Sequence, residues 1–499
     1  MRLTKGGPHR PHGNGRAHKS CIIRKQRVTD PRRTPTPRTK RPYHTLRPTQ
    51  KRERRAQLRS VVAQAEQQIG CPLEAIAPSS NTSPVDLVHL STSVREQIRG
   101  VRGLRIPSEK LMIACKQHLA DTYATETGTF AGGAYVTDPL RFVSVLCAQS
   151  PSFLAVGGDA GGGRCIIGVT YSHQSVQHFA PLLVYEGGDS WLELQDCRAE
   201  GLTPFTGVSA AFPHIWAVLQ HLIDTRSAFL NGDWCFINAA LGLMSPSATH
   251  PCPICIVSHK NFLHSSRYRT PSDKHSIDPT HQPLLTIPPE RIVPTPLHLF
   301  LGIGNRIILE AFSELFGQEC LQSALTSITT IHSAGCGGKS DLYDLNGPEI
   351  SKFIKKECST DILAAAGATT TITDSMKASH SLFSRWLQQL HHSLLHSGDW
   401  TPAHIDAWRT AVDDIQQHWQ SEAHSKPFPK LHMLRHTVEF AERHRFLGRA
   451  SESQTESCHA TLNALFHKQH RNQSHNVSER LRRCLADASL RAVQPFLQQ

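Results

Sequence analysis

The sequence lacks an apolar run long enough to cross a bilayer, and its start lacks the hydrophobic segment of a secretory signal. Its 14 cysteines also lack the dense spacing of a disulfide scaffold. We therefore expect a protein without a membrane anchor in a reducing compartment. There, a Cys-x-x-Cys motif is more typical of a metal site than of a disulfide.

Acidic residues are scarce at the start of the chain. Residues 1–59 contain 19 Lys and Arg against 2 Asp and Glu, a net charge of +17 (19 − 2). The remaining residues carry 35 basic (54 − 19) and 39 acidic (41 − 2) side chains, so the excess of +13 arises entirely in this tail. We expect residues 1–50 to be disordered and to contact nucleic acid phosphates. An anionic membrane surface and a solvated or targeting tail are the alternatives. A basic tail on an intracellular protein predicts nuclear localisation in a eukaryote.

Short apolar segments typical of strands occur at 152–156, 164–171, 180–185 and 227–230, with a helical pattern at 210–223 before the last. Asp159 follows the first predicted strand and Asp233 follows the fourth. Three strands, a helix and a fourth strand, with an acid after the first and the last, predict an α/β fold with a ribonuclease-H-like core.

Helical patterns dominate the rest of the chain. They lie at 51–69, 87–103, 107–122, 235–243, 297–316, 319–331, 348–357, 380–395, 402–422, 451–467 and 477–493. We therefore expect the core to be interrupted by a large all-helical insertion. The predicted parts are a disordered basic tail (1–50), a helical N-terminal region for DNA or dimer contacts (51–148), the first part of the core (149–260), the insertion (261–425) and C-terminal helices that complete the core (426–499).

Two pairs of metal-ligand residues lie far apart in the sequence. Cys252 and Cys255 form a Cys-x-x-Cys motif, and His432 and His436 fall on one face of a predicted helix. Together they are the ligand set of a closed tetrahedral zinc site. Such a structural site would join positions 177 residues apart (432 − 255). The chain has 31 histidines, and we assign no role to His298, His332, His391 or His392.

Three separated acids suggest a second metal site. Asp159, Asp233 and Glu456 could hold Mg²⁺ or Mn²⁺, because carboxylates are the hard oxygen ligands that these ions prefer. Two ions held in this way would activate a nucleophilic oxygen and stabilise a leaving oxyanion in phosphodiester chemistry. Glu452 is the alternative to Glu456 as the third acid, because it lies on the same predicted helical face.

The ordered set of these motifs resembles the Transib transposases and the catalytic subunit of the V(D)J recombinase. The resemblance is distant and covers roughly residues 150–260 and 425–470. It is carried by Gly158-Asp-Ala-Gly161, Gly232-Asp233, Leu241-Gly-Leu243, Pro251-Cys-Pro-Ile-Cys255, Lys430-Leu-His-Met-Leu-Arg-His436 and Leu447-Gly-Arg-Ala-Ser-Glu-Ser-Gln-Thr-Glu-Ser457.

The resemblance implies a DDE recombinase that binds DNA ends as a homodimer, nicks one strand with water and then uses the freed 3′-hydroxyl as a nucleophile. It implies Mg²⁺ at Asp159, Asp233 and Glu456, and zinc at the Cys/His set. The alternative is a domesticated or decayed relative that binds double-stranded DNA without cutting it. A zinc-stabilised interaction protein without a DNA role is a third, weaker possibility.

Overall fold

The computed structural model describes residues 109–189, 194, 213–263, 267–270, 272–277, 281–326, 345–355, 358–369, 371–421, 428–470 and 476–496. The basic tail and the helices predicted at 51–69 and 87–103 lie outside these residues. The predicted helix at 107–122 corresponds to α3 (Glu109–Tyr123).

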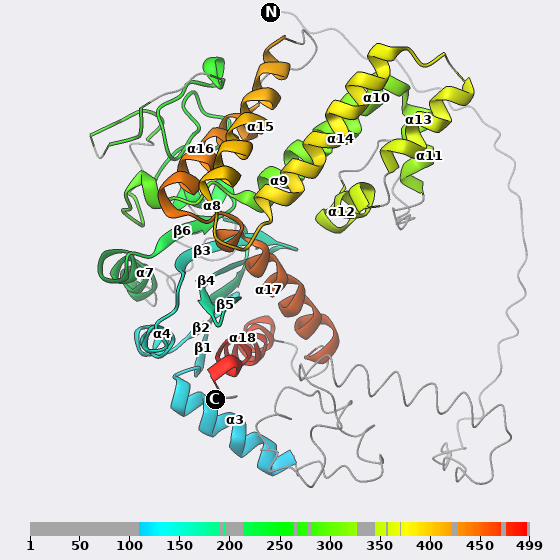
Figure 1. The fold of residues 1–499 in the computed structure, drawn as a ribbon. Coiled ribbons are helices and arrows are strands. Elements are labelled where there is room, and N and C mark those ends of the chain that lie inside the picture. Colours follow the sequence, from blue (N-terminus) through cyan, green and yellow to red (C-terminus); the bar gives the residue numbers. More distant parts are fainter. Residues whose placement is uncertain are drawn as a thin grey trace, which may run out of the picture. The chain divides into compact units, whose positions relative to one another are not determined.

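The described strands are β1 (Thr127–Phe130), β2 (Gly133–Val136), β3 (Leu154–Gly161), β4 (Arg164–His173), β5 (Val176–Glu186) and β6 (Phe229–Gly232). They form one mixed sheet in the order β1-β2-β5-β4-β3-β6 (Figure 1). The neighbours β3, β4 and β5 are antiparallel, whereas β6 runs parallel to β3. The predicted α/β class is therefore confirmed.

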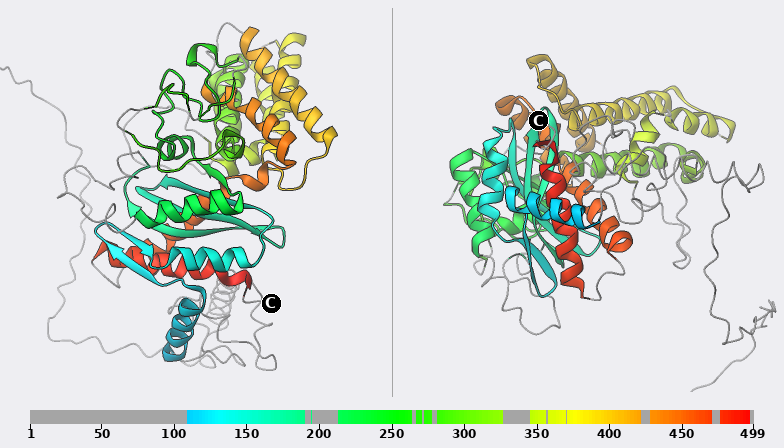
Figure 2. Two further views of the ribbon diagram at one scale, coloured as in Figure 1. Left: turned by 90° about the vertical axis from the view of Figure 1, so that its left-hand side faces the viewer. Right: turned by 90° about the horizontal axis from the view of Figure 1, so that it is seen from below.

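Helices cover both faces of the central strands. The helices α17 (Ser453–Ala464) and α18 (Val477–Val493) lie on one face, and α4 (Pro139–Ala148) and α7 (Pro213–Arg226) lie on the other (Figures 1 and 2). This double cover explains why the strand sequences are almost continuously apolar. In β4 every residue from Arg164 to Ser172 is buried.

The structure differs from the sequence prediction at the start of the core. Asp159 lies inside β3 rather than after it, because pairing with β4 continues to Gly161 opposite Arg164. Residues 127–136, expected in a helical region, form the hairpin β1–β2, which joins the same sheet through β5. The sheet therefore crosses the domain boundary predicted at residue 149.

Helices follow one another between the sheet and the C-terminal section. They are α8 (Trp234–Ala240), α9 (Pro296–Asn305), a π-helical stretch (Arg306–Ala311), α10 (Phe312–Phe316), α11 (Gln318–Thr326), α12 (Gly347–Lys355), α13 (Cys358–Thr369), α14 (Asp374–Leu394) and α15 (Pro402–Ser421). The helix predicted at 297–316 corresponds to α9, the π-helical stretch and α10, which follow one another without a break. The helix α13 was not expected from the sequence. Buried Trp386 of α14 and Trp408 of α15 belong to the continuous apolar core.

The C-terminal section contains α16 (Pro429–His444), α17 and α18, as the sequence predicts. Short 3₁₀ turns lie at His259–Asn261, Pro289–Arg291, Gly448–Ala450 and Gln494–Phe496, and a second π-helical turn spans Leu465–Gln469. Among the described residues, no helix is both long and apolar enough to cross a membrane.

Candidate metal centres

The Cys-x-x-Cys segment and α16 come together as the sequence predicts. Cys252 and Cys255 lie in the loop that follows α8, and His432 and His436 lie in the first half of α16. All four side chains are buried, and their donor atoms all lie within 4.8 Å of one another. These residues form a Cys₂His₂ cluster that could bind zinc.

The spacing of the donor atoms fits a tetrahedral ion. Zn–N bonds of about 2.0–2.1 Å and Zn–S bonds of about 2.3 Å place neighbouring nitrogens about 3.3 Å apart and a sulfur about 3.6 Å from a nitrogen. The Nε2 atoms of His432 and His436 are 3.1 Å apart. Cys255 Sγ lies 3.2 Å from His432 Nε2, and Cys252 Sγ lies 3.5 Å from His436 Nε2.

Hydrogen bonds on the far side of each imidazole fix its tautomer. His432 Nδ1 donates to the carbonyl oxygen of Phe262 at 2.8 Å, and His436 Nδ1 donates to the Glu439 carboxylate at 2.7 Å. Each ring therefore presents Nε2 to the cluster while Nδ1 is held by a partner outside it. This is the arrangement typical of a histidine that ligates a metal ion.

Further side chains, which carried no recognisable sequence signal, hold the cluster in place. The buried Arg269 donates to the carbonyl oxygens of Cys252, His250 and His275 at 2.7–2.8 Å. The Tyr268 hydroxyl donates to Glu439 at 2.8 Å. These contacts fix the backbone of the Cys-x-x-Cys segment and the Glu439 carboxylate that orients His436.

Asp159 and Asp233 lie side by side at one end of two parallel strands. β3 and β6 are in register with Gly158 opposite Gly232, so Asp159, inside β3, and Asp233, directly after β6, are each the next residue along. A Cβ on Gly232 would lie 2.5 Å from the Gly158 carbonyl oxygen, and the φ of Gly232 is +139°. A glycine is therefore required at position 232 for the two strands to approach this closely. Asp233 also caps α8, accepting a 2.6 Å hydrogen bond from Phe236 N.

The two glutamates of α17 differ in their surroundings. Glu456 lies close enough to Asp159 for the two carboxyl groups to shift each other's pKa, and its side chain is 42 % exposed. Glu452 is fully buried, and its carboxylate accepts from Leu297 N at 3.1 Å and contacts His298 Nδ1 at 3.4 Å. Glu456 therefore faces Asp159 and His298, whereas Glu452 anchors the first turn of α9. The group whose donor atoms have the spacing of metal ligands is Asp159, Asp233 and His298.

His298, to which the sequence assigned no role, lies at the acid cluster. One of its ring nitrogens lies within 4.8 Å of carboxylate oxygens of both Asp159 and Asp233. Its Nε2 lies 3.8 Å from Glu456, while Glu452 contacts Nδ1 on the other side of the ring. Nothing in the sequence distinguishes His298 from the chain's many other histidines, so only the fold reveals it.

The acids and their neighbours shift one another's pKa values. Burial, and then the charge of Asp189, raise the pKa of Asp233 to about 7. Burial and the charge of Asp159 raise the pKa of Glu456. Burial works to raise the pKa of Asp159 as well, but the hydrogen bond and charge of His459 outweigh it and lower that pKa. Carboxylates that disfavour each other's ionised form are stabilised when a cation binds between them.

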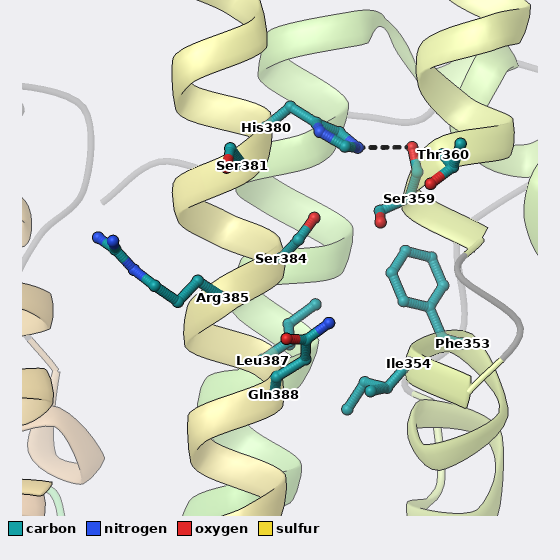
Figure 3. Close-up of a pocket in the computed structure, with 10 residues that line it drawn as sticks. All are labelled: Phe353, Ile354, Ser359, Thr360, His380, Ser381, Ser384, Arg385, Leu387 and Gln388. Atoms are coloured by element: carbon teal, nitrogen blue, oxygen red, sulfur yellow. Dashed lines mark hydrogen bonds between the residues drawn. The ribbon is translucent and has the colours of Figure 1, made fainter. Parts of the chain in front are cut away.

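A cavity of about 280 Å³ lies among α12, α13 and α14, and none of the predicted site residues lines it. His380 and Ser384 point into it, and His380 Nε2 hydrogen-bonds with the Ser359 carbonyl oxygen at 2.8 Å (Figure 3). Arg385 extends away from it (Figure 3).

No protein-family model matches this chain, and no curated protein matches it significantly. The interpretation of both clusters therefore rests on their residues and geometry.

Proposed function

We propose that this protein is a metal-dependent DNA transposase or recombinase whose acid cluster hydrolyses and transfers phosphodiester bonds at DNA ends. One observation carries the proposal. Asp159, Asp233 and Glu456, spread over 297 positions (456 − 159), converge at the end of two parallel strands and the start of one helix. Acidic side chains of an ordinary solvated surface would be spread out rather than gathered at one end of two buried strands.

The sheet supports the proposal. Three antiparallel strands followed in the chain by a fourth strand that pairs parallel to the first are the arrangement expected of a ribonuclease-H-like core. Asp159 lies in the first of these strands and Asp233 directly follows the fourth, while Glu456 approaches Asp159 from a helix packed across the sheet. The helices α9 to α15 are inserted before that helix, as expected of the proposed insertion.

The donor set fits divalent cations with hard oxygen ligands, because three carboxyl groups gather where two of them have raised pKa values. Asp159, Asp233 and Glu456 would hold Mg²⁺ or Mn²⁺, which activates water or a 3′-hydroxyl and stabilises the leaving oxyanion. His298 presents Nε2 to the same space, and Glu452 fixes its ring. His298 is therefore placed to contact a phosphate oxygen of the bound strand.

Zinc at the Cys₂His₂ cluster would have a structural role, because all four positions are protein ligands and all are buried. It would join α16 to the loop that follows α8, and α8 is the helix that Asp233 caps. In this way the ion would hold together parts of the acid cluster that the helical insertion separates in sequence.

The test is cleavage of supercoiled DNA in Mg²⁺ or Mn²⁺. We expect the wild type to nick the DNA, and Asp159→Asn and Glu456→Gln to lose nicking by at least about 100-fold while keeping their zinc. Glu452→Gln removes a charge from the same helix, but we expect it to lower cleavage less, because Glu452 orients His298. Nicking that survives Glu456→Gln and Asp159→Asn would refute the proposal.

A further inference from the structure

Lys430 lies across the backbone of α9 at a glycine. A Cβ on Gly302 would lie 2.2 Å from Lys430 Cδ and 2.6 Å from its Nζ. Any residue other than glycine at position 302 would therefore make the end of the Lys430 side chain move. The missing side chain of Gly302 leaves the space that Lys430 occupies.

This position brings the ammonium group to the turn of α9 that follows His298. Gly302 and His298 are four residues apart on α9, so they share one face of the helix, one turn from each other. His298 faces Asp159, Asp233 and Glu456. The Cys235 thiol, two residues after Asp233, lies near both Lys430 and the acids. Burial and the charges of Asp233 and Asp159 work to raise its pKa, whereas the charge of Lys430 works to lower it. Lys430 comes from α16, so the helix that carries the zinc-ligand histidines also supplies a cation next to the acids.

We propose that Lys430 binds a phosphate of the DNA backbone next to the bond that the acid cluster cuts. This inference rests on the proposed function. An approaching DNA strand meets carboxylates that disfavour it except where metal ions neutralise them. An ammonium group one helical turn from His298 offsets this repulsion at a neighbouring phosphate and sets the register of the strand over the acids.

The charge and position of Lys430 can be varied separately. Lys430→Gln removes the charge, and Lys430→Arg keeps a cation. Gly302→Ala keeps the lysine but forces its side chain to move. The matched control is Lys377→Gln on α14, because Lys377 is 58 % exposed and pairs with Asp374 within its own helix. Zinc content and melting temperature verify that each variant is folded.

The experiment measures the Kd of each full-length protein for a duplex DNA in Ca²⁺, over a series of salt concentrations. Loss of one phosphate contact reduces the slope of log K against log salt by about 0.9. We expect this reduction and about fivefold weaker binding for Lys430→Gln and Gly302→Ala, but not for Lys430→Arg or Lys377→Gln.

An unchanged slope in Lys430→Gln would overturn the inference about Lys430 but would leave the proposed function standing. If the wild type shows no salt-dependent binding at all, the proposed function fails and the inference fails with it. Equal loss in Lys377→Gln would show a general effect of charge and would also overturn the assignment of Lys430.

Discussion

Removal of the proposed structural zinc ion should destabilise the fold, and the size of this effect can be estimated. An ion that binds only the folded chain stabilises it by about 4 kcal/mol when its concentration is about 1,000 times its Kd. A folded unit of roughly 300 residues unfolds with an entropy of about 0.6 kcal/mol/K, taking about 2.1 cal/mol/K per residue. Chelation should therefore lower the melting temperature by about 6 °C, measured by calorimetry in matched buffers.

Substitutions separate this effect from general damage. Cys255→Ser should bind less zinc and lose most of its response to chelator, because a ligand of the buried cluster is gone. Cys320→Ser, on the half-buried Cys320 of α11, is the matched control and should respond to chelator like the wild type. A wild type that contains zinc but melts at the same temperature after its complete removal would refute the structural role of the site.

Two further predictions concern β3, the strand that contains Asp159. Gly157→Ala should destabilise the protein by at least about 1–3 kcal/mol, because the new Cβ would lie 2.1 Å from the Asn231 side chain and 2.3 Å from its carbonyl oxygen. The control is Gly367→Ala inside a helix, where the nearest side-chain atom to the new Cβ would be 3.6 Å away and no such loss is expected. Denaturant unfolding compares the two variants. His459→Gln should shift the acidic limb of the pH–rate profile of cleavage to higher pH. His459 lowers the pKa of Asp159, so without it the carboxyl group stays protonated to a higher pH; an unshifted limb would contradict this assignment.

The sequence predicted most of the strands, because the covered sheet required long apolar segments that local reasoning recognises. It also paired Cys252 and Cys255 with His432 and His436, because the tetrahedral ligand set is recognisable from residue types alone. The last helices of the chain were predicted for a similar reason. Their helical patterns have few internal breakers, so a helix carrying His432 and His436 was expected and α18 was identified at its observed bounds.

Other features depend on contacts between distant segments and could not be predicted. The hairpin β1–β2 is made of strands of four residues, and only its pairing with β5 makes it part of the sheet. The distinction between Glu452 and Glu456 depends on which glutamate meets α9, a contact 155 positions away. Lys430 reaches the turn of α9 next to His298 only because α9 and α16 pack together, and nothing in either segment's sequence indicates this contact.

The most direct test of the central claim is a change of metal preference at Asp233. A thiolate ligates Mg²⁺ poorly but accepts the softer Mn²⁺. If Asp233 holds the ion that drives cleavage, Asp233→Cys should lose DNA cleavage in Mg²⁺ and regain a measurable part of it in Mn²⁺, whereas Asp233→Ala should stay inactive in both. Cleavage by Asp233→Cys in Mg²⁺ at the rate of the wild type, or equal cleavage by Asp233→Ala, would contradict a metal-bound role for Asp233.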